Sequence, residues 1–293
     1  MKLIMRNFWL VSTAHLEDGL WFRDEADFVA AMNLVAILAL DGKVRILTFI
    51  LMSNHVHFVL RGSQEDVLLF IHAFKRRYSL YLRRKYGVKE FLRQNEVDLM
   101  PVPQEPEALE RVIAYVQMNC VAANICSHPG QYPWGTGKSF FNVAKPSGRT
   151  IGSLSGRARK RLMHSESEAL PKDWRISDEG YVFPDEYVDI PVVEKCFRSP
   201  KRMNYFLMNS SKAKKRLDRS EEHLPAFRDQ TILAALPDLC SSLFGKRSYE
   251  ELTEGEQTEF VHQIRFRFSA NVNQVARVCG ISYEEAARKM DRV

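Results

Sequence analysis

Residues 49–60 read FILMSNHVHFVL, two apolar runs joined at Met52-Ser53-Asn54. Apolar runs of this length on either side of a short turn predict two neighbouring strands of one sheet. Side chains alternate faces along a strand, so His55 and His57 project from one surface while Val56 and Phe58 project from the other. We therefore expect one face of the second strand to be core and the other to be available for binding.

The two histidines are the first candidates for a metal site. Neutral imidazoles on one side of a stiff strand are placed to share a divalent ion, because the backbone fixes their separation before the metal arrives. The alternative is that His55 and His57 are partly buried polar residues without a ligand.

A second group of candidates lies on a helix predicted over residues 107–123. Its apolar residues recur at the three-and-four spacing of an amphipathic helix, and they are Leu109, Val112, Ile113, Val116 and Cys120. At about 100° per residue, Tyr115 and Asn119 lie one turn apart on the flank of this stripe. Either the two side chains serve one site together, or Tyr115 is an ordinary tyrosine at the edge of the core and Asn119 is a polar residue near the end of the helix.

Taken together, these segments resemble the HUH-type single-tyrosine transposases (IS200-like transposases), most closely the branch associated with repetitive extragenic palindromes. The resemblance lies in the histidine strand FILMSNHVHFVL, in the basic helix FKRRYSLYLRRKYG after it, and in AYVQMNCVAANICSHPGQYPWGT, which is similar to the family's tyrosine helix and Tyr-Pro-Trp segment. Order and spacing agree as well, over residues 7 to 141.

The resemblance implies a role for each matching residue. His55 and His57 match the metal-binding pair, Tyr115 matches the nucleophile, and Asn119 occupies the place of a third, helix-borne metal ligand. In such enzymes Mg²⁺ or Mn²⁺ polarises a phosphate of single-stranded DNA. The tyrosine oxygen attacks phosphorus and gives a 5′-phosphotyrosine and a free 3′-hydroxyl.

Two departures from the family leave other functions open. Cys120 stands where the family usually has proline, and Ala122 stands where a basic residue is common. One alternative is a domesticated DNA-binding or regulatory protein that no longer cleaves. Another is phosphodiester hydrolysis with the two histidines as acid and base, which would make Tyr115 dispensable. Tyr86, which lies off the apolar stripe of its helix, is a second candidate nucleophile.

The charge of the chain agrees with a nucleic-acid partner. Its 293 residues carry a formal charge of +6, and its pI is near 9.0. Cations gather on the helix after the histidine strand, whose apolar stripe is Val67, Phe70, Ile71, Phe74, Tyr78, Tyr81 and Leu82, and again in GRTIGSLSGRARKRL. The predicted DNA contacts in these clusters are Lys75, Arg76, Arg77, Arg83, Arg84, Lys85, Arg157, Arg159, Lys160 and Arg161. The alternatives are a solvated helix face and a plain surface loop.

The order of the predicted elements gives the fold class. Residues 1–143 are predicted to form an α+β domain, a small antiparallel sheet with helices on one face, of the ferredoxin-like or palm kind. Residues 144–222 are predicted to be a basic connector with short irregular elements, extended between Val143 and Ser167. Residues 223–293 are predicted to form a helical, helix-turn-helix-like domain. In it a helix over 254–268 precedes NVNQVARVCGISYEEAARKM, where Ala276, Gly280 and Ile281 fit that motif.

The expected partner is single-stranded or hairpin DNA. The C-terminal helices either bind duplex DNA as well or serve packing or dimerisation, since Glu284 and Glu285 repel phosphate. Five cysteines without a Cys-x-x-Cys pair favour a reducing cytosol and argue against a zinc module. The apolar run within the first ten residues is too short for the core of a signal peptide or for a membrane span. We expect a prokaryotic, cytoplasmic, nucleoid-associated protein without membrane contact, as a monomer or homodimer.

Overall fold

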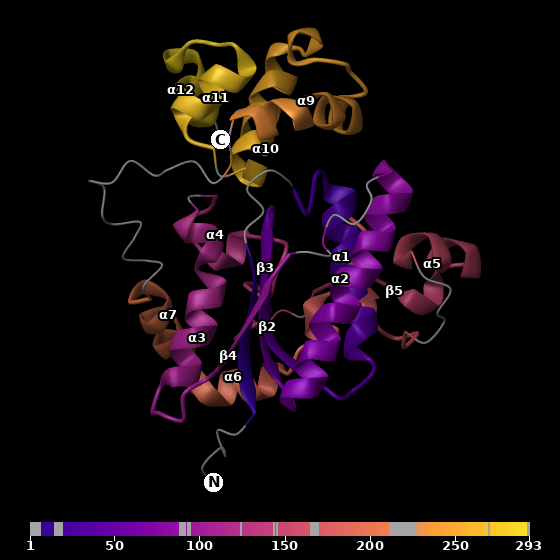
Figure 1. The fold of residues 1–293 in the computed structure, drawn as a ribbon, viewed down its shortest axis with the longest axis vertical. Coiled ribbons are helices and arrows are strands. Elements are labelled where there is room, and N and C mark those ends of the chain that lie inside the picture. Colours follow the sequence, from indigo (N-terminus) through magenta and orange to yellow (C-terminus); the bar gives the residue numbers. More distant parts are fainter. Residues whose placement is uncertain are drawn as a thin grey trace.

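The computed structural model of the protein is drawn in Figure 1. It describes residues 7–14, 20–87, 92, 95–123, 125–142, 144, 146–164, 170–210, 227, 229–268 and 270–291. A four-stranded antiparallel sheet in the order β2-β3-β1-β4 forms its centre. The strands are β1 (Phe8–Thr13), β2 (Arg45–Met52), β3 (His55–Arg61) and β4 (Val97–Pro101).

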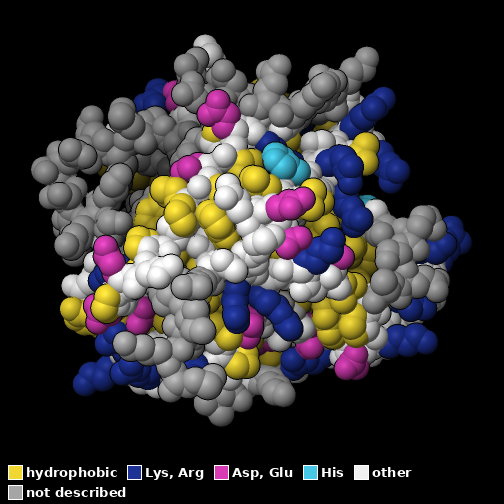
Figure 2. All heavy atoms as spheres, turned by 60° about the horizontal axis from the view of Figure 1, so that its bottom comes forward, with side chains coloured by type: hydrophobic (Ala, Val, Ile, Leu, Met, Phe, Trp, Pro, Cys, Tyr) yellow, Lys and Arg dark blue, Asp and Glu magenta, His cyan; other side chains and the backbone are white. Residues whose placement is uncertain are grey.

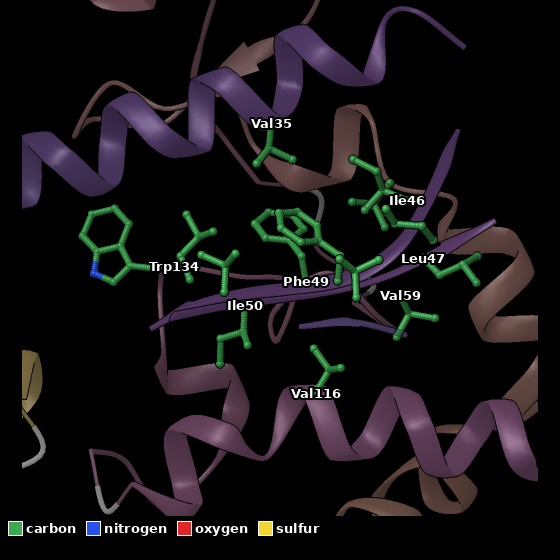
Figure 3. Close-up of a cluster of buried hydrophobic side chains, with 14 of the residues drawn as sticks. Val35, Ile46, Leu47, Phe49, Ile50, Val59, Val116 and Trp134 are labelled. Carbon is green, nitrogen blue, oxygen red and sulfur yellow. The ribbon is translucent and has the colours of Figure 1, made fainter. Parts of the chain in front are cut away.

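Helices cover both faces of this sheet. Helices α1 (Glu25–Ala39) and α2 (Gln64–Tyr86) lie on one face, while α3 (Ala108–Gln117) and the short α4 (Asn119–Ala122) lie on the other (Figure 1). Val35 of α1 and Val116 of α3 approach the sheet from opposite sides (Figure 3). The α+β class and the antiparallel sheet are confirmed, but helices were expected on one face only. The near-continuous apolar runs of β2 and β3 explain the difference, because such strands are buried on both sides.

Local sequence signals mark the starts of α1 and α2 and the end of α2. Asp24 caps α1 and forms a capping box with Asp27. Ser63 accepts a hydrogen bond from the amide of Asp66 at the start of α2, and Gly87 ends α2 in the left-handed conformation at φ 70°. The apolar stripe predicted for α2 faces the core, with only Tyr81 partly exposed.

The stretch after the sheet is packed against it. It contains the 3-10 turns η1 (Pro129–Gln131), η2 (Ile151–Ser153) and η3 (Pro184–Glu186), the short strands β5 (Arg149–Thr150) and β6 (Arg175–Ile176), and the helices α5 (Gly156–Met163), α6 (Ile190–Phe197) and α7 (Pro200–Met208). The extended connector predicted up to Ser167 is therefore helical over α5. Val193, Phe197 and Phe206 join the main core, because the short apolar runs between prolines fold back onto the sheet and α3.

The C-terminal part is helical. It consists of α9 (Asp229–Phe244), the 3-10 turn η4 (Tyr249–Glu251), α10 (Glu254–Phe268), α11 (Val272–Cys279) and α12 (Tyr283–Asp291). These helices share a second core around Leu239, Phe260 and Val275. The helix predicted over 254–268 is confirmed as α10, and Gly280 ends α11 at φ 66°. The boundaries at 143 and 222 stay a prediction.

None of the helices among the described residues combines the length and the apolar character that crossing a bilayer requires.

Candidate active site

The histidine strand and the tyrosine helix meet on one face of the sheet. The centroid of the His57 ring lies 4.7 Å from that of His55 and 5.9 Å from that of Tyr115, which it meets edge-on at 78°. Both histidines are buried, whereas the Tyr115 side chain is partly exposed. The structure thus brings three of the four residues with predicted catalytic or metal-binding roles into one place.

Hydrogen bonds at Nδ1 orient both imidazoles. Nδ1 of His57 lies 2.7 Å from the Ser12 hydroxyl, and Nδ1 of His55 lies 2.7 Å from Oδ1 of Asn54. An amide oxygen only accepts, so Nδ1 of His55 carries the proton and Nε2 carries the lone pair. This is the tautomer that coordinates a metal through Nε2, with the partner at Nδ1 holding the ring. The donor set therefore fits a divalent ion.

The histidine pair can supply only part of a coordination shell. Among the residues that the structure describes, no group of three or more histidine, cysteine or acidic side chains is placed to hold an ion. Substrate phosphate oxygens and water are the oxygen ligands that Mg²⁺ and Mn²⁺ prefer. Phosphate oxygens of a DNA substrate and water could therefore add to the two histidine ligands of an ion at this site.

Asn119 follows a break between two helices. Helix α3 ends at Gln117, and Asn119 begins α4 after Met118. Its amide nitrogen donates to the carbonyl oxygens of Tyr115 at 3.0 Å and Val116 at 3.1 Å. The side chain therefore caps the turn that carries Tyr115, and its role as a third metal ligand stays a prediction.

The register of the sheet adds two residues that sequence reasoning missed. Ser12 of β1 lies opposite His57 on one side and opposite Asp98 of β4 on the other. Residues directly opposite in a sheet project from the same face, so all three share the face on which α3 packs. Without the register, nothing in the sequence VDLMP of β4 points to Asp98.

The surroundings of Tyr115 keep its phenol protonated. Burial and, second, the charge of Asp98 raise the pKa of Tyr115 above its ordinary value. A neutral phenol is a weak nucleophile, so these surroundings do not by themselves make Tyr115 reactive.

Tyr86, the other candidate nucleophile, is engaged inside the protein. Its hydroxyl donates to Asp27 at 2.9 Å and to Asp24 at 3.1 Å. Burial and these two carboxylates raise the pKa of Tyr86 far above its ordinary value. Both features argue against Tyr86 as the nucleophile.

The ten predicted DNA contacts fall into two groups. Lys75 is buried and donates to the carbonyl oxygen of Asn95, and Lys85 bridges Asp24 and Asp27 with Nζ 2.6 and 2.8 Å from their oxygens. Of the other eight, only Arg159 is half-buried, and the exposed ones are Arg76, Arg77, Arg83, Arg84, Arg157, Lys160 and Arg161.

A groove of about 1010 Å³ lies between α1, α2 and the end of α5. Its lining includes Arg77 and Arg84 of α2 and, at the end of α5, Met163 and His164. On the face shown in Figure 2, Lys and Arg side chains gather on the right-hand side, which is the side of α2 and α5 in Figure 1. The cations of α2 therefore line this groove, whereas the cations of α5 belong to the helix whose end closes it.

Residues 22–118 match the family described as transposase IS200-like. The matched span contains His55, His57 and Tyr115, and it ends one residue before Asn119. Searches of curated proteins and of solved structures found no match.

Proposed function

We propose that this chain, whose residues 22–118 form an IS200-like transposase domain, is a metal-dependent transesterase that nicks and joins single-stranded DNA near hairpins through a 5′-phosphotyrosine. IS200-like transposases are DNA-cleaving enzymes, so DNA is the substrate that the domain implies. The observation that supports the proposal is the packing of the Tyr115 ring against His57, which brings the proposed nucleophile beside the proposed metal-binding pair.

In the proposed reaction, Oη of Tyr115 attacks a phosphorus atom of the DNA strand. The Oη–P bond forms and the P–O3′ bond to the preceding nucleotide breaks. The leaving 3′-oxygen takes up a proton, and the phenol gives one up, so the protons balance. Because the phosphodiester energy is kept in the phosphotyrosine, a second 3′-hydroxyl can reverse the step and join strands without ATP.

His55 and His57 would hold the metal ion through Nε2. Mg²⁺ or Mn²⁺ bound there would polarise the phosphate and neutralise developing charge, and Mn²⁺ tolerates nitrogen ligands better. Ser12 and Asn54 keep the two rings in the orientation that coordination needs. Asp98 disfavours the phenolate of Tyr115, which limits attack before substrate and ion are in place.

The exposed cations of α2 and α5 are the proposed contacts to the DNA backbone. Arginine and lysine on such a surface bind phosphates regardless of base sequence. Lys75 and Lys85 are left out of this proposal, because one is buried on a carbonyl and the other neutralises two carboxylates.

A domesticated DNA-binding protein is the second candidate. It is favoured by the Asn119 amide, which donates to the carbonyl oxygens of Tyr115 and Val116 on α3. The C-terminal helices are expected to contribute little to the recognition of double-stranded DNA. The exposed side of α12 carries Glu284 as well as Arg288, and these charges offset each other.

One experiment separates these functions. Wild type, Tyr115→Phe and, as a matched control, Tyr86→Phe are incubated with labelled hairpin oligonucleotides from the flanks of the gene, with Mn²⁺ or with EDTA. We expect a denaturant-resistant protein–DNA adduct that needs both the metal and Tyr115 and persists in Tyr86→Phe. Cleavage by Tyr115→Phe would indicate hydrolysis instead, and binding without cleavage or adduct would favour the domesticated protein.

A further inference from the structure

The tyrosine helix is held from the side that faces away from the sheet. Helix α7 packs along α3 and lies beside it in Figure 1, and α6 joins the same contact. Nη2 of Arg202 on α7 lies 3.0 Å from Oε1 of Glu107 and 3.4 Å from Oε1 of Glu110. One guanidinium therefore binds two carboxylates in the first turn of α3.

Glu110 makes this contact more than a surface ion pair. The residue is buried, and its carboxylate lies close enough to Cys196 on α6 that, after burial of the thiol, the Glu110 charge raises the pKa of Cys196. A buried carboxylate costs free energy unless a positive charge and hydrogen bonds compensate it. Arg202 supplies that charge, so the position of Glu110 is tied to the position of α7.

The start of α3 depends on the same arginine. Glu107 is the N-cap residue of α3, at φ 66°, and its side chain makes no capping hydrogen bond. Instead its carboxylate binds Arg202 and, at 3.5 Å, Arg111. A helix of ten residues that breaks at Met118 is marginal by itself, so external contacts decide where it lies.

Glu110 and Tyr115 face opposite directions. Five residues at about 100° each place them about 140° apart around the helix. Tyr115 meets His57 on the sheet side, and Glu110 meets Arg202 on the α7 side. Helix α3 is thus fixed between the metal-binding strand and α7.

We propose that Arg202 is a positioning residue, which holds the first turn of the tyrosine helix so that Tyr115 stays against His57. Helices α6 and α7 then complete the active site, although they lie beyond the matched transposase span of residues 22–118. The inference rests on the proposed function, because the residue that Arg202 positions is the proposed nucleophile. Its chemical basis is that a displacement of about 1 Å can cost about 100-fold in rate.

The test compares Arg202→Gln with Lys201→Gln, which removes the same charge from an exposed neighbour on α7. Adduct formation with a hairpin oligonucleotide and Mn²⁺ is followed at saturating DNA, and the dissociation constant for DNA is measured separately. We expect Arg202→Gln to slow adduct formation about 10- to 100-fold with an unchanged dissociation constant. Lys201→Gln should behave like wild type.

Rescue distinguishes positioning from a general loss of folding. Glu110→Gln in the Arg202→Gln background removes the buried unpaired charge and should recover part of the rate, as should Arg202→Lys alone. Equal rates in Arg202→Gln and Lys201→Gln would overturn the proposal. So would an Arg202→Gln protein that loses DNA binding and rate together without recovery in either rescue variant.

Amide hydrogen exchange of α3 gives a readout that does not depend on activity. Arg202→Gln should exchange residues 108–117 faster than Lys201→Gln does, with β3 unchanged in both. If the wild-type protein forms no adduct, the proposed function fails. Amide hydrogen exchange still tests whether Arg202 holds α3. Equal protection of α3 in the two variants would refute the positioning role whether or not wild type cleaves DNA.

Discussion

Ser12 and His57 face each other across β1 and β3, with the Ser12 hydroxyl 2.7 Å from Nδ1 of His57. Partners of this kind hold a metal-ligating imidazole in one tautomer and one orientation. Ser12→Ala is therefore expected to weaken Mn²⁺ binding about 10- to 100-fold while leaving the fold intact. Titration calorimetry with Mn²⁺ measures the effect.

Ser79→Ala on α2 serves as the control for Ser12→Ala, because Ser79 lies on the opposite face of the sheet from the histidines. Equal Mn²⁺ affinity in the two variants would mean that the Ser12 hydroxyl does not support the metal site.

Tyr115 packs against the His57 of its own chain. One chain therefore contains both halves of the proposed site, and we expect no activity when Tyr115→Phe and His57→Ala proteins are mixed. Each variant lacks one half, and only exchange of the tyrosine helix between chains could restore a complete site. The assay is the protein–DNA adduct in the mixture; an adduct above the sum of the two separate variants would show that the site is assembled between chains.

The histidine pair and the tyrosine helix could be predicted because their signals are local. Alternation along β3 placed His55 and His57 on one face, and the apolar stripe of α3 placed Tyr115 on the flank of its helix. The family resemblance implied that the two belong to one site. Ser12 and Asp98 could not be found in the same way, because their place in the site follows from the pairing of β1 with both β3 and β4. Register is a long-range property that alternation within one strand does not specify.

The partners of single cations were equally hidden from the sequence. Lys75 and Lys85 belong to a basic run, yet one ends on a backbone carbonyl and the other on two carboxylates of α1. Both contacts join segments that are far apart in the chain. Helix periodicity separates the apolar stripe from the polar face, but it does not show which polar residues meet a partner.

Lys85 supports the contact between α1 and α2. Its amine binds Asp24 and the fully buried Asp27, while 28% of the Lys85 side chain is exposed. Lys85→Met would leave two neighbouring carboxylates without their cation, and we expect it to lower the free energy of unfolding at neutral pH by about 2 kcal/mol, discounted for solvent exposure. Urea denaturation measures the loss, with Arg84→Met as the exposed control.

The pH dependence of Lys85→Met follows from the sign of the Asp27 shift. Burial and then the charge of Asp24 raise the pKa of Asp27 in the folded state, whereas Lys85 lowers it. Removing Lys85 raises that pKa further. A carboxyl with a raised folded-state pKa lowers stability as pH rises through that pKa, so the deficit of Lys85→Met should shrink as the pH falls from about 7 to about 5. A deficit that grows on acidification would contradict this assignment.

Arg77 and Arg84 line the groove between α1, α2 and α5 and carry the clearest test of the DNA path. If each neutralises one phosphate, the double variant Arg77→Gln/Arg84→Gln should weaken binding of single-stranded DNA and reduce the slope of log affinity against log salt by about 1.4, or about 0.7 per contact. Lys75→Gln should leave that slope unchanged, because its amine is buried on the Asn95 carbonyl. Fluorescence anisotropy over a salt series measures both, and an unchanged slope in the double variant would place the DNA elsewhere on the protein.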